Sequence, residues 1–235
     1  MVREEDALVI AARDVAVPVA PAGPADGCTE DLPRLMALPG LIGTRVLFGR
    51  RQEIFGADEE ARSIYRVISG AVRDVTVLTD GRRQVSAFHL AGDVFGLTAG
   101  PRHSHSAEAV VETVAMVYPR RPIEDAARRD ARLACTLWLA ALRQLEQGQD
   151  HVLLLGRRSA VERVAAFLSE IEQRSVGSGW FVLPMTRRDI ADYLGLTIET
   201  VSRAVTRLEA EGALLRAGAK RIRLRHAPLR HLMGD

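Results

Sequence analysis

Residues 186–212, TRRDIADYLGLTIETVSRAVTRLEAEG, decide how the C-terminal part of the chain folds. Thr186 can cap a first helix, and Asp189, three positions later, can reach back to the start of that helix in a capping box. Gly195 can adopt the left-handed backbone that a sharp turn requires, and Thr197 can cap a second helix. The stretch therefore predicts two short helices joined by a tight bend.

The apolar residues of this stretch fall on one side of each predicted helix. The small residue Ala191 is followed four positions later by Gly195 and six positions after that by Val201. This spacing is typical of a helix-turn-helix, because the small residue lets the helices cross closely and the valine locks the second helix in place. The residues expected to face inward are Ile190, Ala191, Leu194, Val201, Val205 and Leu208.

The second helix carries a polar face opposite its apolar stripe, formed by Glu199, Ser202, Arg203 and Thr206. These residues lie in the N-terminal half of the second helix, which is the part that enters the major groove of DNA in a helix-turn-helix. Arg203 can bridge O6 and N7 of guanine, Glu199 can accept from cytosine N4 or adenine N6, and Ser202 can approach thymine or the backbone closely. The alternative is a solvated face on which Glu199 and Arg203 form an ion pair. The complete two-helix pattern favours DNA.

The segment after Gly212, ALLRAGAKRIRLRH, predicts a two-stranded wing in which Ile222 and Leu224 alternate with arginines. Residues 156–235 hold 14 Lys and Arg against 9 Asp and Glu, whereas residues 1–155 hold 18 and 21. Positive charge beside a DNA-shaped element favours phosphate contact, with plain solubilising charge as the alternative. The wing arginines are Arg221, Arg223 and Arg225.

Residues 1–31 and 32–121 differ in composition. The first segment contains VAVPVAPAGPADG, whose prolines oppose helix and sheet, so we expect a mobile N-terminal arm. The second alternates short β-prone runs with glycine turns, and Asp80-Gly81 predicts a hairpin between two of these runs. We expect an all-β barrel or roll here. Its marker residues are Gly70, Val72, Val75, Val77, Val85, Phe88, Gly92 and Gly96.

Residues 122–156 predict a long helix that Pro122 can start. The proline-free part, from about Arg128 to Leu155, has about 28 residues and would span roughly 40 Å, which is longer than a small roll needs. The apolar stripe on this helix could pack on its own domain, but we favour a coiled-coil-like seam between the two copies of a homodimer. The seam residues are Trp138, Leu142, Leu145, Gln149 and Val152.

Residues 157–235 predict a winged helix-turn-helix domain that begins with one further amphipathic helix, SAVERVAAFLSEIEQR. A short strand, WFVLPM, separates that helix from the helix-turn-helix. The predicted fold class is thus α+β: a β-roll, a long dimerisation helix and a winged helix-turn-helix. In the amphipathic helix we expect Val161, Val164, Ala165, Leu168 and Ile171 to face inward.

Several function classes find no support in the sequence. There is no P-loop, no nucleophile elbow and no metal-ligand cluster, so we do not expect an enzyme. No apolar run approaches the roughly 18 residues of a membrane helix, and the start MVREEDALVI is no secretory signal. These features indicate a cytoplasmic protein without a membrane partner.

The order of β-roll, long helix and winged helix-turn-helix resembles the CRP/FNR regulators of bacterial transcription over about residues 32–225. The segment MTRRDIADYLGLTIETVSRAVTRLEAEGAL is similar to the FNR and FixK branches, whose E-x-x-S-R motif is matched by Glu199, Ser202 and Arg203. The cyclic-AMP-responsive branch typically carries glycine where Ser202 stands and arginine where Ile198 stands. The roll would then be a cyclic-nucleotide-binding-like domain.

The resemblance implies a homodimeric activator that reads TTGAT-type palindromes in double-stranded DNA and contacts RNA polymerase. Glu199, Ser202 and Arg203 would contact bases. Backbone or auxiliary contacts are expected from Thr186, Arg187, Thr197, Ile198, Thr200, Thr206, Arg221 and Arg223.

The sensor domain departs from the family's ligand-binding branches. The FNR branch holds an iron–sulfur cluster on four cysteines, and this chain has only Cys28 and Cys135. Where the cyclic-AMP branch has a glutamate and an Arg-Ser pair, this chain has Leu97 and His105-Ser106, which disfavours a cyclic nucleotide even if Arg102 supplied charge. We expect a FixK-like regulator without cofactor or effector, acting in oxygen limitation or redox response. An effector-gated sensor is the alternative, and its candidate haem ligands are His89, His103, His105 and His151.

Overall fold

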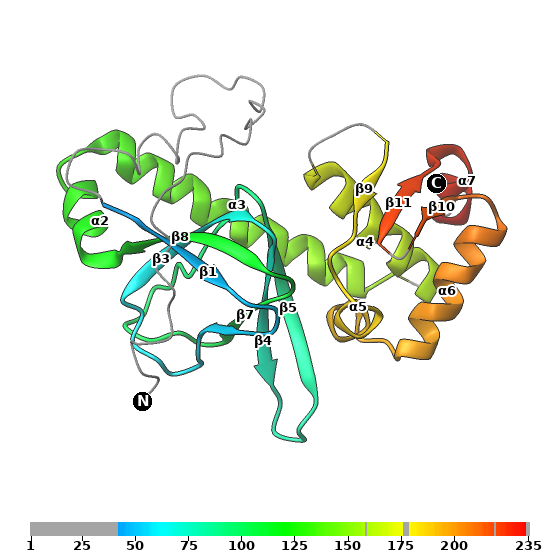
Figure 1. Ribbon diagram of the computed structural model, residues 1–235, viewed down its shortest axis with the longest axis horizontal. Helices are drawn as coiled ribbons and strands as arrows, with labels where there is room; N and C mark the ends of the chain where they lie inside the picture. The colour runs from blue at the N-terminus through cyan, green and yellow to red at the C-terminus, as the bar shows by residue number, and fades with distance from the viewer. Residues whose placement is uncertain (1–41, 158, 176–178, 219, 234–235) are drawn as a thin grey trace. The chain divides into compact units, whose positions relative to one another are not determined.

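The computed structural model describes residues 42–157, 159–175, 179–218 and 220–233 (Figure 1). The N-terminal arm predicted for residues 1–31 lies outside them. The chain forms two compact units. Of the described residues, one unit comprises those up to Arg73 together with His89–Glu146, and the other comprises Asp74–Phe88 together with those from Gln147 onward.

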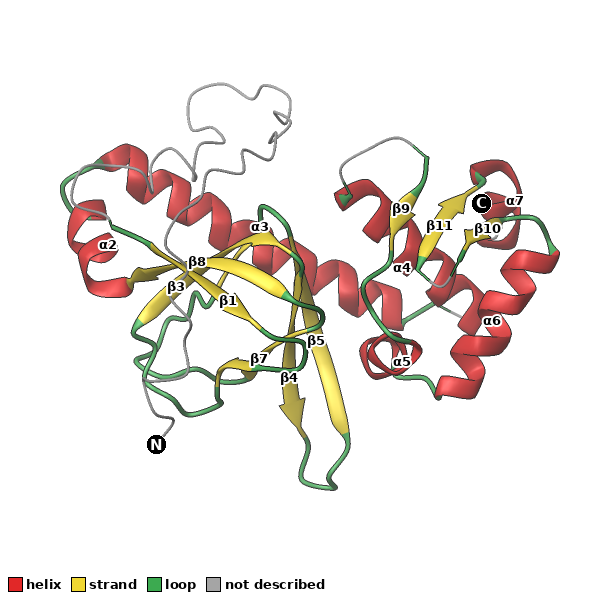
Figure 2. Ribbon diagram, viewed as in Figure 1, coloured by secondary structure: helices red, strands yellow, loops and turns green. Residues whose placement is uncertain are grey.

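Two four-stranded sheets build the predicted β-roll (Figure 2). One has the order β1-β8-β3-β6, and β8 pairs antiparallel with both of its neighbours. The other has the order β2-β7-β4-β5. The strands are β1 Thr44–Phe48, β2 Glu53–Phe55, β3 Ser63–Ser69, β4 Ala71–Val77, β5 Arg83–Leu90, β6 Val94–Phe95, β7 Ser106–Ala109 and β8 Thr113–Pro119.

Aromatic rings fill the core of the roll. Phe55, Tyr65 and Phe95 are buried, and the ring centroid of Tyr65 lies 5.5 Å from that of Phe55 and 5.0 Å from that of Phe95. Val67 and Val72 pack in the same cluster. These side chains come from β2, β3, β4 and β6, so they pin both sheets together.

The hairpin predicted at Asp80-Gly81 is confirmed. Gly81 has φ +81°, its N–H donates to the carbonyl of Leu78 at 2.9 Å, and the N–H of Leu78 donates to the carbonyl of Arg82 at 2.8 Å. Of the five apolar residues expected on the hairpin, Val77 is 71% exposed. The other four, Val72, Val75, Val85 and Phe88, are buried.

Gly70 joins β3 to β4 with φ +93°. A Cβ at this position would lie 2.6 Å from the backbone oxygen of Glu112 and against the hydroxyl of Thr113, which accepts the N–H of Ala71. The turn therefore requires glycine both for its backbone angle and for its space.

Gly70→Ala is expected to lower the free energy of unfolding, measured in urea, by more than about 2 kcal/mol, because it adds overpacking to left-handed strain. Gly92→Ala is the control, since Gly92 has φ +100° with nothing within 4 Å of the added Cβ. This control should cost only the strain, about 1–2 kcal/mol. Equal losses would show that the Glu112 and Thr113 contacts are unimportant.

The region predicted as one long helix contains two helices, α2 Arg120–Ala127 and α3 Ala131–Leu155. Asp130 lies in the break, and its carboxylate accepts the N–H of Arg132 at 2.8 Å. An acidic side chain that accepts an N–H of the first helical turn stabilises the start of a helix, which explains why α3 begins here.

The described helices include none that is long and apolar enough to cross a membrane.

The winged helix-turn-helix follows the predicted order. Its three-stranded sheet has the order β10-β11-β9, so the strand before the helix-turn-helix joins the two wing strands. Val161, expected inside α4, is half-buried, whereas the unpredicted Phe167 is fully buried. A final helix was not predicted. The elements are α4 Ala160–Arg174, β9 Phe181–Val182, α5 Arg187–Leu194, α6 Ile198–Ala210, β10 Leu214–Ala217, β11 Arg221–Leu224 and α7 His226–Met233.

Candidate nucleic-acid interface

The start of α5 has the predicted capping box. The hydroxyl of Thr186 accepts the N–H of Asp189 at 3.2 Å, and the Asp189 carboxylate accepts the N–H of Thr186 at 2.9 Å. The Thr186 hydroxyl also donates to this carboxylate at 2.6 Å. Thr186, expected as an auxiliary DNA contact, is thus held in the cap by three hydrogen bonds.

The turn and the second helix also form as predicted. Gly195 ends α5 with φ +62° and ψ +37°, and the Thr197 hydroxyl caps α6 by accepting the N–H of Thr200 at 3.2 Å. The hydroxyls of Thr197 and Thr200 also lie 3.0 Å apart. Thr197 is exposed, whereas Thr200 and Ile198 are half-buried. The predicted stripe of Val201, Val205 and Leu208 is buried, which fixes the opposite face outward.

That outward face presents Glu199, Arg203 and Thr206, which are exposed, and Ser202, which is half-buried. The Ser202 hydroxyl donates to the carbonyl of Ile198 at 2.8 Å, and the Thr206 hydroxyl donates to the carbonyl of Ser202 at 3.0 Å. Each hydroxyl oxygen keeps acceptor capacity. The four side chains therefore lie on one accessible surface of α6.

The alternative in which Glu199 and Arg203 form an ion pair is not realised within the part of the chain that the structure describes. The ion pair found along α6 joins Arg207 to Glu211 at 4.0 Å. The backbone N–H of Glu199 itself and the Thr197 hydroxyl, followed by the charges of Arg203 and Arg188, hold the pKa of the Glu199 carboxyl below its usual value. Glu199 is therefore an ionised acceptor.

Arg188 is a candidate that the sequence analysis missed. It is exposed on the first turn of α5, and its charge reaches Glu199 on α6. The Arg187-Arg188 doublet is a signal for it, but the prediction includes only Arg187. Arg187 is half-buried, and burial followed by the charge of Arg216 lowers its pKa.

The wing presents the expected alternation. Ile222 and Leu224 are buried, whereas Arg221 and Arg223 are exposed. The guanidinium carbon of Arg221 lies 5.6 Å from the ring centroid of Trp180, within cation–π range. The wing thus carries exposed cations on one face and a buried apolar face beneath them.

The predicted seam on α3 is largely exposed. Trp138, Leu145 and Val152 are 64%, 58% and 68% exposed. Leu142 is half-buried and Gln149 is exposed. Three large apolar side chains repeated every seven residues form a stripe of the kind that pairs with another helix.

The histidines considered as haem ligands pack against aromatic rings. His103 is buried and stacks on Phe55 with ring centroids 3.7 Å apart, and His105 is 6.0 Å from the same ring. His89 is buried and stacks on Phe95 at 5.1 Å.

His151 belongs to the other unit, where it is buried and stacks on Tyr193 at 3.9 Å. Among described residues, no group of three or more His, Cys, Asp or Glu is arranged to hold a metal ion. Cys28 lies outside those residues.

Comparison with known families agrees with this geometry. The family model of the cyclic nucleotide-binding domain matches residues 45–130, and that of the Crp-like helix-turn-helix domain matches residues 162–229. The chain belongs to the CRP/FNR family of transcriptional regulators. It is therefore a helix-turn-helix regulator and not an enzyme, as the sequence predicted.

Within the CRP/FNR family the chain is FixK-like. The nitrogen fixation regulation protein FixK of Azorhizobium caulinodans is 44% identical over 189 residues, covering 78% of this chain and 76% of that protein. FixK of Rhizobium meliloti is 42% identical over 190 residues, covering 81% and 85%. The structure of FixK2 from Bradyrhizobium japonicum shares 48% identity with a TM-score of 0.78, covering 82% of this chain and 98% of that one.

Proposed function

We propose that this CRP/FNR regulator binds TTGAT-type palindromes as a homodimer and activates transcription by contacting RNA polymerase. The observation that carries this proposal is the exposed α6 face, on which Glu199 and Arg203 are not paired with each other. Charged side chains that are held on a rigid helix and are not paired with each other can hydrogen-bond base edges without first breaking an ion pair.

Each base contact has a distinct chemical role. Arg203 donates two parallel hydrogen bonds to O6 and N7 of guanine, and the ionised Glu199 accepts from an exocyclic amine of cytosine or adenine. Ser202 lies between them in sequence and contributes a small hydroxyl at close range. Thr197, Thr200, Thr206 and Ile198 surround these three residues and would contact the backbone or neighbouring groups.

The proposed homodimer rests on the α3 stripe. A second copy of the chain would cover Trp138, Leu145 and Val152, whose seven-residue repeat suits a parallel two-helix seam. A palindromic site presents its two half-sites with the same two-fold symmetry as such a dimer.

The proposal includes no small-molecule effector. It is supported by the ring cluster of Phe55, Tyr65 and Phe95 in the roll core and by Leu97, an apolar residue at the position expected to bind a ribose hydroxyl. The proposed role in oxygen limitation or redox response is what the resemblance to the FixK branch implies. An activating role is supported by a transcriptional activatory protein, AadR of Rhodopseudomonas palustris, which is 40% identical over 193 residues.

Selection of bound DNA from a random pool, using protein purified in air, tests the proposal. We expect enrichment of TTGAT-type palindromes with no ligand added. An absorption spectrum of the same sample checks for a haem Soret band. A haem band, or binding only after an effector is added, would favour an effector-gated regulator instead.

Arg223→Ala is expected to weaken binding to all DNA sequences alike and to reduce the slope of log K against log salt by about one, because a lost phosphate contact releases one counterion fewer. Arg216→Ala is the control. Arg216 donates to Glu209 at 2.7 Å, so its charge is already compensated. A base-specific loss in Arg223→Ala would contradict a phosphate contact.

A further inference from the structure

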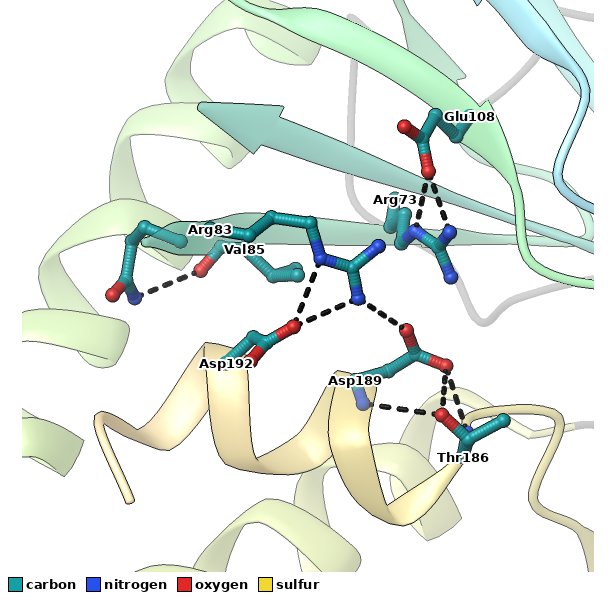
Figure 3. A network of polar contacts seen from close by, with 8 residues as sticks. Arg73, Arg83, Val85, Glu108, Thr186, Asp189 and Asp192 are labelled. Atoms are coloured by element: carbon teal, nitrogen blue, oxygen red, sulfur yellow. Dashed lines mark hydrogen bonds and ion pairs between the residues drawn. The ribbon is translucent and has the colours of Figure 1, made fainter. Parts of the chain in front are cut away.

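A single arginine of the β4–β5 hairpin binds two carboxylates of α5 (Figure 3). The Arg83 Nε atom donates to Asp192 at 2.9 Å, and its Nη2 atom donates to Asp189 at 3.0 Å and lies 2.8 Å from Asp192. The side chains of Arg83, Asp189 and Asp192 are 27%, 2% and 18% exposed. Removing one partner from ionic hydrogen bonds with so little solvent access costs more than breaking an exposed pair, because the remaining charge is left buried.

Asp189 links Arg83 to the start of the helix-turn-helix. One oxygen of its carboxylate accepts from Arg83, and the other accepts both the N–H and the hydroxyl of Thr186. The same carboxylate therefore holds the α5 cap and the hairpin, so loss of Arg83 would remove a cationic partner from a nearly buried charge.

Aromatic packing keeps the hairpin in register with these carboxylates. The Phe88 ring lies 5.9 Å from Phe167 and 5.1 Å from Tyr193. Arg174 donates to the carbonyl of Phe88 at 2.6 Å. Residues from α4 and α5 thus hold β5 by contacts that do not involve Arg83, so an Arg83 substitution is expected to leave the hairpin in place.

Charge gives Arg83 a second effect on DNA binding. Asp189 and Asp192 put two negative charges on the helix that supports the recognition helix, and DNA phosphates repel negative charge. Burial lowers the pKa of Arg83, but the hydrogen bonds and charges of Asp192 and Asp189 outweigh it and raise that pKa overall. Arg83 therefore stays cationic and offsets part of this repulsion.

We propose that Arg83 is a positioning residue for DNA binding: it fixes α5 through Asp189 and Asp192 and neutralises their charge without touching DNA itself. This inference rests on the proposed use of α6 as the base-reading helix. Arg83→Ala should raise the Kd for the palindrome about threefold to thirtyfold, the range found for substitutions that act through a coupled network.

Arg82→Ala is the matched control. Arg82 is the neighbouring hairpin residue, and it pairs at 2.7 Å with Asp80 at the exposed tip. The Arg82→Ala substitution removes the same charge from the same hairpin without affecting α5. The Kd of this variant for the palindrome should therefore stay within about twofold of that of the parent protein, as for an ordinary surface pair. Equal weakening by both variants would overturn the proposal in favour of a general charge effect.

The experiment measures Kd by fluorescence anisotropy on the selected palindrome at several salt concentrations, together with amide hydrogen exchange of residues 187–194 in the full-length protein. Arg83→Ala should speed exchange in that segment and reduce the salt slope by much less than one, because its charge acts on the phosphates only from a distance. A slope reduced by about one would mean that Arg83 contacts a phosphate and would overturn the positioning role.

Charge reversal keeps the test decisive if Arg83→Ala unfolds. Arg83→Glu should weaken binding more than Arg83→Ala, because three carboxylates would then meet. Adding Asp192→Arg should restore at least half of the lost binding free energy, and absence of rescue would overturn the proposal. If the parent protein binds no palindrome, the proposed function fails; if the parent binds and Arg83→Ala binds equally well, only this inference fails.

Discussion

Replacing Leu145 and Val152 by aspartate is expected to convert the proposed homodimer into monomers that bind a single half-site. Both side chains are more than half exposed in the single chain, so the substitutions should leave its fold intact. In the seam of a dimer, however, four added carboxylates would be buried against one another without partners. The free-energy cost of burying these unpaired charges should prevent the dimer from forming. Because two linked half-sites gain affinity through effective concentration, palindrome binding should weaken roughly 10²–10⁴-fold.

Sedimentation velocity reports the oligomeric state, and anisotropy on full and half palindromes reports affinity. Arg143→Asp is the control, since Arg143 is exposed on the same helix but lies on a different face from the seam residues. It should remain dimeric. A dimer that persists in the double variant would show that α3 does not form the seam.

Arg203→Ala is expected to lose about 1–3 kcal/mol of binding free energy in each half-site, which is the usual discrimination of one bidentate arginine–guanine contact. With two half-sites the palindrome should weaken by about 2–6 kcal/mol, and preference for guanine at the contacted position should disappear. Competition with palindromes substituted at each position measures both effects.

Arg207→Ala is the control for lost charge. Arg207 is exposed one turn later on α6, where it lies 4.0 Å from Glu211. The Arg207→Ala substitution should weaken binding to all DNA sequences slightly and leave the base preference unchanged. If Arg203→Ala behaves in the same way, Arg203 contacts the backbone and the assignment of base reading to it is wrong.

The helix-turn-helix could be predicted in detail because its signals are local. The cap at Thr186, the left-handed turn at Gly195 and the cap at Thr197 each depend on residues within four positions. Burial of Val201, Val205 and Leu208 follows from helical periodicity alone. The exposed polar face of α6 was then the only side left.

Features that depend on distant residues were not predicted. Arg83 and Asp189 are 106 positions apart, and the capping role predicted for Asp189 gave no sign that an arginine of the hairpin would also bind its carboxylate. The break between α2 and α3 was missed because residues 128–130 contain neither proline nor glycine, and Asp130 can continue a helix as well as cap one. The exposure of Val77 was not predicted either, because the sequence does not show whether a valine near a hairpin tip faces the core or the solvent.

The placement of residues 74–88 with residues 147–235 has a consequence for dissecting the protein. A fragment that starts at residue 147 would retain the whole helix-turn-helix but would strip Phe88 from the rings of Phe167 and Tyr193 and expose them to water. Such a fragment should aggregate, or unfold at a lower temperature than the full chain, although it contains every proposed base-reading side chain.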